Sequence, residues 1–239
     1  MCRGLVSRTV ALRYERIKRL AVLRGWRVTC STRREARWLG VKWREALAQA
    51  NPIVRFKRWF EQARRAGIAQ PEAMALATAE RGGRVSVRYM LLKDFGGPGF
   101  VFYTNSDSAK GHQLSNNPRA ALAFYWGRIG RQVRVEGRVT QVKDEEADAY
   151  WKTRPRGHQL AATASRQTRP LVARRWLVAR IKQLQREFAH KDIPRPLGWT
   201  GFRVEPERIE FWKMRPNRLH DRELFTRHNR GWRRTMLQP

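Results

Sequence analysis

The sequence predicts one α+β domain built around an antiparallel β-barrel. Three observations support this prediction: an amphipathic helix comes first, five period-two segments follow it through short turns, and three or four more strands close the chain after a helical stretch. Short turns favour antiparallel pairing, because parallel neighbours need a crossover of a dozen or more residues. A parallel sheet is therefore not expected, and no internal repeat is visible in the 239 residues.

Residues 1–46 are interpreted as a basic N-terminal extension with partial order, because no clean hydrophobic period runs through them. The stretch from Thr9 to Leu23 is compatible with a helix. The sequence does not reveal the role or the order of residues 1–32. The main domain is expected to span residues 47–239.

This domain begins with a helix at Asn51 and Pro52. An asparagine side chain can accept a hydrogen bond from a free N–H group of the first turn, and proline at the first helical position loses no bond. Apolar residues then recur at helical spacing until Gly67, which predicts an amphipathic helix. These residues are Ile53, Phe56, Trp59, Phe60 and Ala63.

After Gly67 the apolar residues alternate with a period of two, which predicts strands. The expected strands are Ala73–Ala79, Arg84–Phe95, Phe100–Asn105, Arg119–Trp126 and Arg131–Val142, with a short helix across Ser108–Ser115. Two helical segments come next, at Asp144–Thr153, where acidic residues suit a helix N-terminus, and at Arg169–His190. The closing strands are expected at Trp199–Glu205, Arg208–Met214, Leu219–Arg227 and Gly231–Leu237.

The chain is strongly basic, with 51 Lys and Arg against 20 Asp and Glu and a net charge of +31. Two interpretations remain open: a solvated surface rich in arginine, or a polyanionic partner such as nucleic acid. The cations are spread along the chain, and neither zinc-knuckle spacing nor an RNP-like aromatic string is present. We therefore favour the solvated surface and expect no nucleic-acid partner.

Several other classes of protein are excluded by composition and spacing. The two cysteines, Cys2 and Cys30, do not form a disulfide framework and fit a reducing cytoplasm. The longest apolar runs are too short to span a membrane, so no membrane association is expected. No Cys/His cluster supports a metal site, and no glycine-rich phosphate loop of the GxGxxG or GxxxxGK type occurs.

Two stretches have the residue types of phosphate sites. From Tyr103 to Arg119 a strand runs into a serine-rich turn, with Lys110 in the first helical turn, where free N–H groups, hydroxyls and an ammonium favour phosphate. Further on, Tyr150 and Arg154 share a helix face at i, i+4 spacing and can bind one phosphate together. The alternatives are an ordinary serine cap and a solvated basic face.

The segment from Ile209 to Phe225 places three arginines and one histidine after a strand-like stretch. His220 stands between Arg218 and Arg222, and two nearby cations favour a neutral imidazole. A neutral imidazole flanked by fixed donors suits an anionic planar ligand, although a lone surface histidine is the commoner case. No acid or hydroxyl lies at triad spacing, so nucleophilic catalysis is not expected. Arg215 is assigned to the solvated surface.

Four stretches together resemble the pyridoxamine 5′-phosphate oxidases, flavin enzymes that produce pyridoxal 5′-phosphate. They are "RYMLLK", "FYTNSDSAKGHQLSNNPR", "RQVRVEGR" with "YWKTRPRGHQL", and "IEFWKMRPNRLHDR", in the family's order and at its spacings. The resemblance covers the chain from about residue 47 to its end. It implies a split β-barrel that dimerises through C-terminal strands, with flavin mononucleotide (FMN) at the subunit interface and dioxygen as the electron acceptor.

The resemblance also implies which residues bind which ligand. Contacts to FMN are implied for Arg88, Tyr89, Met90, Leu91, Leu92, Lys93, Tyr103, Thr104, Lys110, Gln132, Gln167, Thr168, Trp212 and Arg222, several of them from the partner subunit. Contacts to pyridoxamine or pyridoxine 5′-phosphate are implied for Lys93, Tyr150, Arg154, His158, Arg218, Leu219 and His220. Arg218 and His220 are the implied catalytic pair, which orients the pyridine ring over the flavin.

The chain departs from the family's pattern at several positions. The departures are Ala36 for a tyrosine, Gln70 for an aspartate, Ala109 for an arginine beside the flavin phosphate, His158 for a serine, Thr168 for a serine and Lys213 for a glutamine or histidine. They leave two functions open: an FMN-dependent oxidase that releases hydrogen peroxide, or a non-catalytic or altered-specificity split-barrel protein that binds FMN or pyridoxal phosphate. A preference between the pyridoxamine and pyridoxine phosphates does not follow from the sequence.

Overall fold

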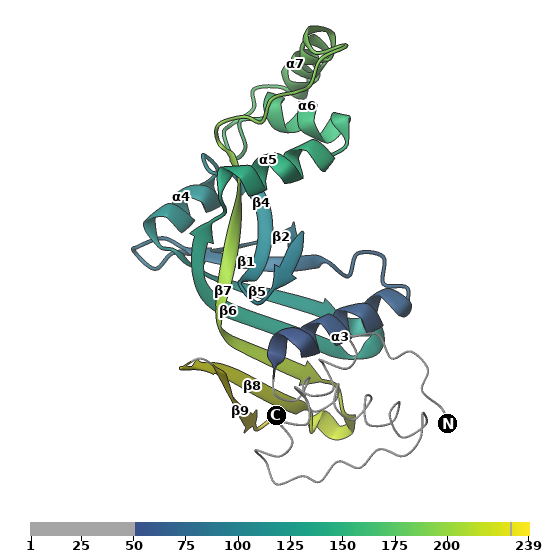
Figure 1. Ribbon diagram of the computed structural model, residues 1–239, viewed down its shortest axis with the longest axis vertical. Helices are drawn as coiled ribbons and strands as arrows, with labels where there is room; N and C mark the ends of the chain where they lie inside the picture. The colour runs from purple at the N-terminus through teal and green to yellow at the C-terminus, as the bar shows by residue number, and fades with distance from the viewer. Residues whose placement is uncertain (1–50, 230) are drawn as a thin grey trace, which may run out of the picture. The chain divides into compact units, whose positions relative to one another are not determined.

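The computed structural model describes residues 51–229 and 231–239, which belong to one compact unit, Ala48–Pro239 (Figure 1). The predicted extension over residues 1–46, the helix from Thr9 to Leu23 and the departure at Ala36 lie outside the described residues. The predicted antiparallel α+β architecture is confirmed, because every strand pairing in the sheet is antiparallel.

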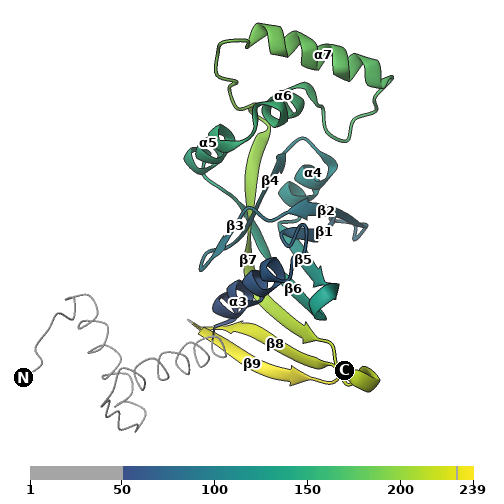
Figure 2. The same cartoon turned by 90° about the vertical axis from the view of Figure 1, so that its right-hand side faces the viewer.

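A nine-stranded sheet forms the centre of this unit, in the order β2-β1-β5-β6-β7-β4-β3, with β8 paired to β7 and β9 to β8. Its strands are β1 Ala73–Ala79, β2 Val85–Leu91, β3 Asp94–Gly96, β4 Gly99–Asn105, β5 Arg119–Trp126, β6 Arg131–Gln141, β7 Trp199–Lys213, β8 Asp221–His228 and β9 Gly231–Leu237. The 15-residue strand β7 pairs with β4 over its first part and with β8 over its last part (Figures 1 and 2).

The helices lie at α3 Pro52–Arg65, α4 Ala109–Asn116, α5 Asp144–Thr153, α6 Arg156–Ala164 and α7 Arg174–Glu187. Helix α3 begins as predicted, with the Asn51 side chain accepting a hydrogen bond from the Ile53 N–H at 2.9 Å. Its buried Phe56 contacts the rings of Phe100 and Phe124 edge-on, at 4.9 and 5.0 Å between centroids. This aromatic contact attaches α3 to one face of the sheet and forms the centre of the core.

The pairing register divides the strands between a core face and an outer face. On the core face, Met74, Leu76, Leu122 and Val133 are buried. On the outer face, alanines of β1 and β5 lie beside the exposed Val85, Val87 and Tyr89 of β2, since Ala79, Ala77 and Ala75 are the register partners of these three residues. Along β6 and β7 the same outer face carries charged side chains, because Ala123 pairs with Arg134, which pairs with Glu210.

The structure differs from the prediction most at four places, which involve five predicted elements. The predicted strand Arg84–Phe95 is split into β2 and β3, because the backbone N–H groups of Leu92 and Lys93 bond to Glu72 and Val101 and redirect the chain. Lys93 therefore does not lie on the same strand as Arg88. The predicted helix Arg169–His190 is helical only at α7, since Thr168 has a left-handed backbone (φ 68°) and Pro170 follows it.

The other two differences concern the closing strands. The predicted strands Trp199–Glu205 and Arg208–Met214 form one continuous strand, in which Pro206 is tolerated at a register shift opposite Gly137. The predicted strand Leu219–Arg227 begins only at Asp221, because residues 216–218 form a short 3₁₀ turn. Leu219 and His220 therefore belong to a loop.

Candidate functional site

The first group of polar side chains surrounds the start of helix α4. Lys110 donates hydrogen bonds to Ser108 Oγ at 3.2 Å and to Gln167 Oε1 at 2.9 Å, and the Thr104 hydroxyl donates to the same Gln167 oxygen at 3.0 Å. The Ala109 N–H donates to Thr168 Oγ1 at 2.8 Å. We call Arg88, Thr104, Ser108, Lys110, Gln167 and Thr168 the cradle.

Local backbone structure explains why these side chains meet. Ser108 caps α4 by accepting from the Gly111 N–H, as predicted for this turn. A Cβ atom on Gly111 would lie 2.1 Å from the Ser106 carbonyl oxygen, so only glycine allows the turn to approach the helix this closely. Thr168 holds its left-handed conformation while its hydroxyl bonds to α4, and such strained residues are concentrated at functional sites.

The cradle holds two cations, of which Lys110 is buried and Arg88 is half-buried. Lys110 is 6% exposed, and burial, aided by the positive charge of Arg88, lowers the pKa of its ammonium from 10.5 to about 8. Burial also lowers the pKa of Arg88, whose guanidinium donates to Thr78 Oγ1 at 2.5 Å and to Gln113 Oε1 at 3.3 Å. None of the ion pairs formed among the described residues includes Lys110 or Arg88. The side-chain partners of both cations in this region are neutral oxygen acceptors.

A cavity of about 430 Å³ opens beside the cradle. It is lined by Met90, Tyr103, Thr104, Asn105, Arg154, His158, Ala161, Ala162, Ser165, Gln167, Leu177, Ile181 and Trp199. The Arg154 guanidinium lies over the Trp199 ring at 4.8 Å, and burial lowers its pKa. Tyr103 stacks on Tyr150 at 4.1 Å, and burial raises the pKa of the Tyr103 phenol to about 12, which keeps it neutral at physiological pH.

The second group lies where β6, β7 and β8 run side by side. Gln132 pairs in register with Trp212, which pairs with Arg222, so the three side chains share the outer face. The Trp212 ring contacts the His220 ring at 4.5 Å between centroids. We call Gln132, Trp212, Arg218, His220 and Arg222 the loop group.

The loop that carries Arg218 and His220 has an unusual backbone. Asn217 and Arg218 both have positive φ, 55° and 61°, which is costly for residues with a side chain. The Arg215 N–H donates to His220 Nδ1 at 3.2 Å, so in this arrangement the second ring nitrogen, Nε2, carries the proton. Arg215 is exposed, as expected for a surface residue, and it binds Asp221 across the loop at 2.7 Å.

The structure brings together some of the predicted site residues and separates others. Met90, Tyr103, Thr104, Arg154, His158 and Gln167 line one cavity, with Lys110 and Arg88 in the adjoining cradle. Lys93 instead lines a second cavity of about 450 Å³ with Phe60, Arg64 and Glu72. Tyr89 is 82% exposed on the outer face, whereas Leu92 is buried in the core, so the segment Arg88–Lys93 does not present one common surface.

Within one chain the loop group does not reach the cavity. The cavity is bordered by Trp199 at the start of β7, and Trp212 lies near the end of this strand, which at about 3.3 Å per residue is roughly 50 Å long. The register also places Arg88 and Gln132 on opposite faces of the sheet, because Tyr89, not Arg88, continues the row of Ala75 and Ala123. One chain therefore carries two separate groups of candidate site residues, which we refer to as the two half-sites.

Sequence reasoning did not identify the neutral partners of the cradle or the acidic partners of the loop group. Thr78 and Gln113 are buried and hold Arg88, yet they come from β1 and α4, where nothing in the sequence marks them as polar contacts of that residue. Glu210, 7% exposed, binds Arg222 at 2.7 Å. In the sequence, the only sign of this role of Glu210 was that a carboxylate stands in a predicted strand between the apolar Ile209 and Phe211.

Comparison with known proteins identifies the family of this chain. Residues 60–188 match the family model described as pyridoxamine 5′-phosphate oxidase, and residues 199–239 match the pyridoxine 5′-phosphate oxidase C-terminal dimerisation region. A pyridoxine/pyridoxamine 5′-phosphate oxidase of Rubrobacter xylanophilus is 55% identical over 80% of this chain and 88% of its own length. A protein of the same name from Myxococcus xanthus is 50% identical over 79% of this chain and 92% of its own.

Solved structures show the same fold. The crystal structure of PhzG from Burkholderia lata, in complex with tetrahydrophenazine-1-carboxylic acid, is 34% identical and superposes with a TM-score of 0.77, covering 80% of this chain and 93% of that one. An FMN-binding protein from Nostoc punctiforme related to pyridoxamine 5′-phosphate oxidase, 18% identical with a TM-score of 0.63, shares the split-barrel fold. This chain belongs to the pyridoxine/pyridoxamine 5′-phosphate oxidase family, a family of oxidoreductases.

Proposed function

We propose that the protein is an FMN-dependent oxidase of pyridoxamine 5′-phosphate and pyridoxine 5′-phosphate. Pyridoxamine 5′-phosphate, dioxygen and water would give pyridoxal 5′-phosphate, ammonia and hydrogen peroxide; pyridoxine 5′-phosphate and dioxygen would give the same aldehyde and hydrogen peroxide. The observation that carries the proposal is a pair of cations, the buried Lys110 and the half-buried Arg88, which lack a carboxylate partner within the described residues and adjoin a cavity that is lined by a third cation, Arg154. FMN and the substrate each carry one phosphate, so one would bind at Lys110 and Arg88 and the other at Arg154.

The cradle fits the phosphate of FMN by its chemistry. It offers an ammonium, a guanidinium, three hydroxyls and the first N–H groups of α4, all of which can donate to a phosphate. Gln132, Trp212 and Arg222 would contact the ring system. When bound, FMN would supply the redox chemistry, accepting a hydride from the substrate and returning the electrons to dioxygen.

The substrate would be held by residues of both half-sites. Arg154, Tyr150 and His158 would bind its phosphate at the cavity, where the aromatic rings beneath Arg154 fix the guanidinium in place. Arg218 and His220 would orient the pyridine ring. His220 would donate from Nε2, because its Nδ1 already accepts the Arg215 N–H.

The proposed enzyme is a homodimer in which each site combines the cavity of one subunit with the loop group of the other. The matched dimerisation region supports dimer formation. The outer face supports it as well, since Val85, Val87, Tyr89 and Tyr125 are 64–82% exposed there, next to small alanines. An apolar face of this kind on a soluble protein indicates contact with another protein surface.

Purification followed by absorption spectroscopy and a peroxide assay tests the proposal. We expect the visible bands of a flavin and release of one hydrogen peroxide per pyridoxal 5′-phosphate formed. A colourless protein that does not bind added FMN would refute the proposal. Sedimentation should give a dimer, and a monomer with full activity would contradict the shared site.

A second function, binding of FMN or pyridoxal phosphate without turnover, is favoured by two departures at the site. Ala109 supplies no cation beside the cradle, and His158 lines the phosphate-binding end of the cavity. Stoichiometric FMN without peroxide release would support this function over the oxidase.

No helix in the described part of the chain is long and apolar enough to cross a membrane. We propose a cytoplasmic location, which fractionation of cells would test.

A further inference from the structure

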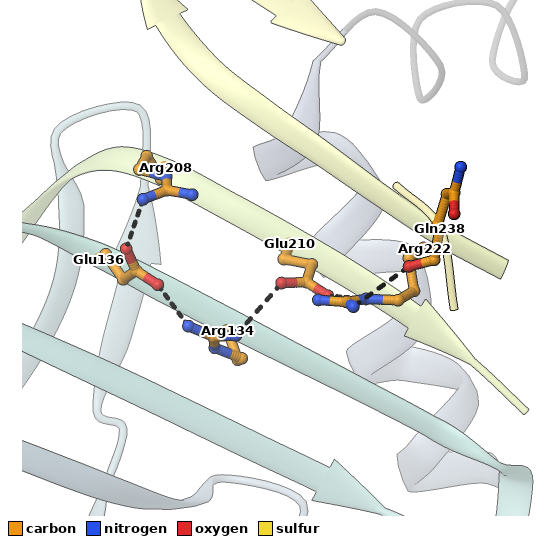
Figure 3. A network of polar contacts seen from close by, with 6 residues as sticks. All are labelled: Arg134, Glu136, Arg208, Glu210, Arg222 and Gln238. Atoms are coloured by element: carbon orange, nitrogen blue, oxygen red, sulfur yellow. Dashed lines mark hydrogen bonds and ion pairs between the residues drawn. The ribbon is translucent and has the colours of Figure 1, made fainter. Parts of the chain in front are cut away.

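Glu210 lies between two arginines on the outer face of the sheet (Figure 3). Its Oε1 accepts a hydrogen bond from Arg222 Nε at 2.7 Å, and its Oε2 accepts one from Arg134 Nη1 at 3.3 Å. Only 7% of Glu210 is exposed, so the carboxylate is shielded by the cations that it binds. The network continues through Arg134 to Glu136 and Arg208, and therefore links β6, β7 and β8.

The contacts of Arg222 leave one side of its guanidinium available. Nε binds Glu210, and Nη1 donates to the backbone carbonyl of Gln238 at 3.2 Å, as Figure 3 shows. Within the described residues Nη2 makes no hydrogen bond. Because two of the three nitrogens are held, the plane of the guanidinium is fixed and Nη2 points in one direction, and Arg222 lies on the same face of the sheet as its register partner Trp212.

We propose that Glu210 is a positioning residue for the cofactor: its carboxylate fixes Arg222 so that Nη2 can donate to the flavin ring. This inference rests on the proposed function, in which Arg222 contacts FMN. Glu210 does not touch the flavin itself and acts through the arginine. A neutral residue at position 210 would leave Arg222 and Arg134 without their shared counter-charge, and Arg222 would lose its fixed orientation.

The chain contains a matched control on the next strand. Glu223 of β8 is 8% exposed and also lies between two arginines, Arg55 at 2.5 Å and Arg234. It faces helix α3, where the Arg55 guanidinium lies over the Phe211 ring at 4.7 Å. The two carboxylates are therefore equally buried and each binds two arginines, but only Glu210 binds a residue of the loop group.

The experiment compares Glu210→Gln with Glu223→Gln in the purified dimer. The dissociation constant of FMN is measured by quenching of flavin fluorescence, and stability is measured by urea unfolding of the flavin-free protein. We expect Glu210→Gln to weaken FMN binding about tenfold, as for the loss of one charge-assisted hydrogen bond. We expect Glu223→Gln to lower the urea midpoint while changing FMN affinity less than twofold.

Three further variants keep the result interpretable. Arg222→Ala alone and Arg222→Ala with Glu210→Gln should bind FMN equally weakly, because Glu210 acts only through Arg222. If Glu210→Gln does not fold, Glu210→Gln with Arg134→Gln removes one of the two facing cations and should fold with the same weakened binding.

Three outcomes would overturn the inference. One is unchanged FMN affinity in Glu210→Gln; another is an equal loss of affinity in Glu223→Gln, which would indicate general destabilisation; the third is a further loss when Glu210→Gln is added to Arg222→Ala. A wild-type protein that binds no FMN would refute the proposed function together with this inference, and is distinguished from the other outcomes by the wild-type titration alone.

Discussion

The two half-sites differ in the charge of the groups that bind their cations. In the cradle, neutral oxygens accept the hydrogen bonds of the cations. Lys110 donates to Ser108 and Gln167, and Arg88 donates to Thr78 and Gln113. In the loop group and its surroundings, carboxylates bind two of the cations, since Glu210 pairs with Arg222 and Asp221 with Arg215.

This difference supports our proposal of a different task for each half-site. Buried cations without a counter-ion gain most from an external anion, because the ligand supplies the missing charge. Cations that are already paired gain little net charge interaction from a ligand, and they contribute mainly a fixed direction of donation. The cradle is therefore suited to binding phosphate, and the loop group to orienting a ring.

The largest expected effect concerns orientation of the substrate. Arg218→Ala should lower kcat/KM about 100-fold, as for the loss of a charged hydrogen bond that is needed in the reacting geometry. Steady-state kinetics with pyridoxamine 5′-phosphate measures it. FMN affinity should change little, and a large loss of FMN instead of turnover would contradict the division between the two half-sites.

The next effect concerns the phosphate of the cofactor. Lys110→Met should weaken FMN binding about 30-fold, because the methionine keeps the volume but removes one charged donor. Fluorescence titration measures it, with riboflavin, which lacks the phosphate, as the control ligand. Equal losses for FMN and riboflavin would show that Lys110 does not serve the phosphate.

The pH dependence of binding should distinguish the half-sites further. The pKa of Lys110 is lowered to about 8 in the flavin-free protein, and a bound phosphate would favour the charged ammonium, so binding takes up a proton above this pH. FMN affinity should fall as pH rises above about 8, by up to about tenfold per pH unit. Lys110→Arg keeps its charge and should show no such fall; a parallel fall in this variant would implicate another group.

The smallest effect concerns the exposed ion pair between Arg215 and Asp221, which spans the loop that carries Arg218 and His220. Arg215→Ala and Asp221→Asn should each lower stability by less than about 1 kcal/mol, because both partners are substantially exposed. They should lower kcat/KM only several-fold, less than Arg218→Ala, by releasing the loop that holds His220. Urea unfolding and steady-state kinetics provide the two values, and a loss as large as that of Arg218→Ala would assign Arg215 a direct contact with substrate.

Much of the fold was predictable because it depends on local periodicity. The strands Ala73–Ala79 and Arg119–Trp126 were predicted with the bounds found, and the first helix was predicted with the start found, since turn residues and caps mark these ends. The errors came where long-range pairing decided the outcome. Leu92 and Lys93 have strand-like neighbours, but their hydrogen bonds to Glu72 and Val101 end β2 and start a new direction.

The sequence by itself determined the residue types of the site: two cation-containing phosphate motifs and an arginine-histidine loop, each readable from a contiguous stretch. Tertiary structure alone decided that these form two half-sites. The faces on which Arg88 and Gln132 lie depend on the register of β1, β2, β5 and β6, and the partners of Arg88 and Arg222 come from other strands and helices. The neutral or acidic character of those partners, which divides anion binding from orientation, arises only when distant segments pack together.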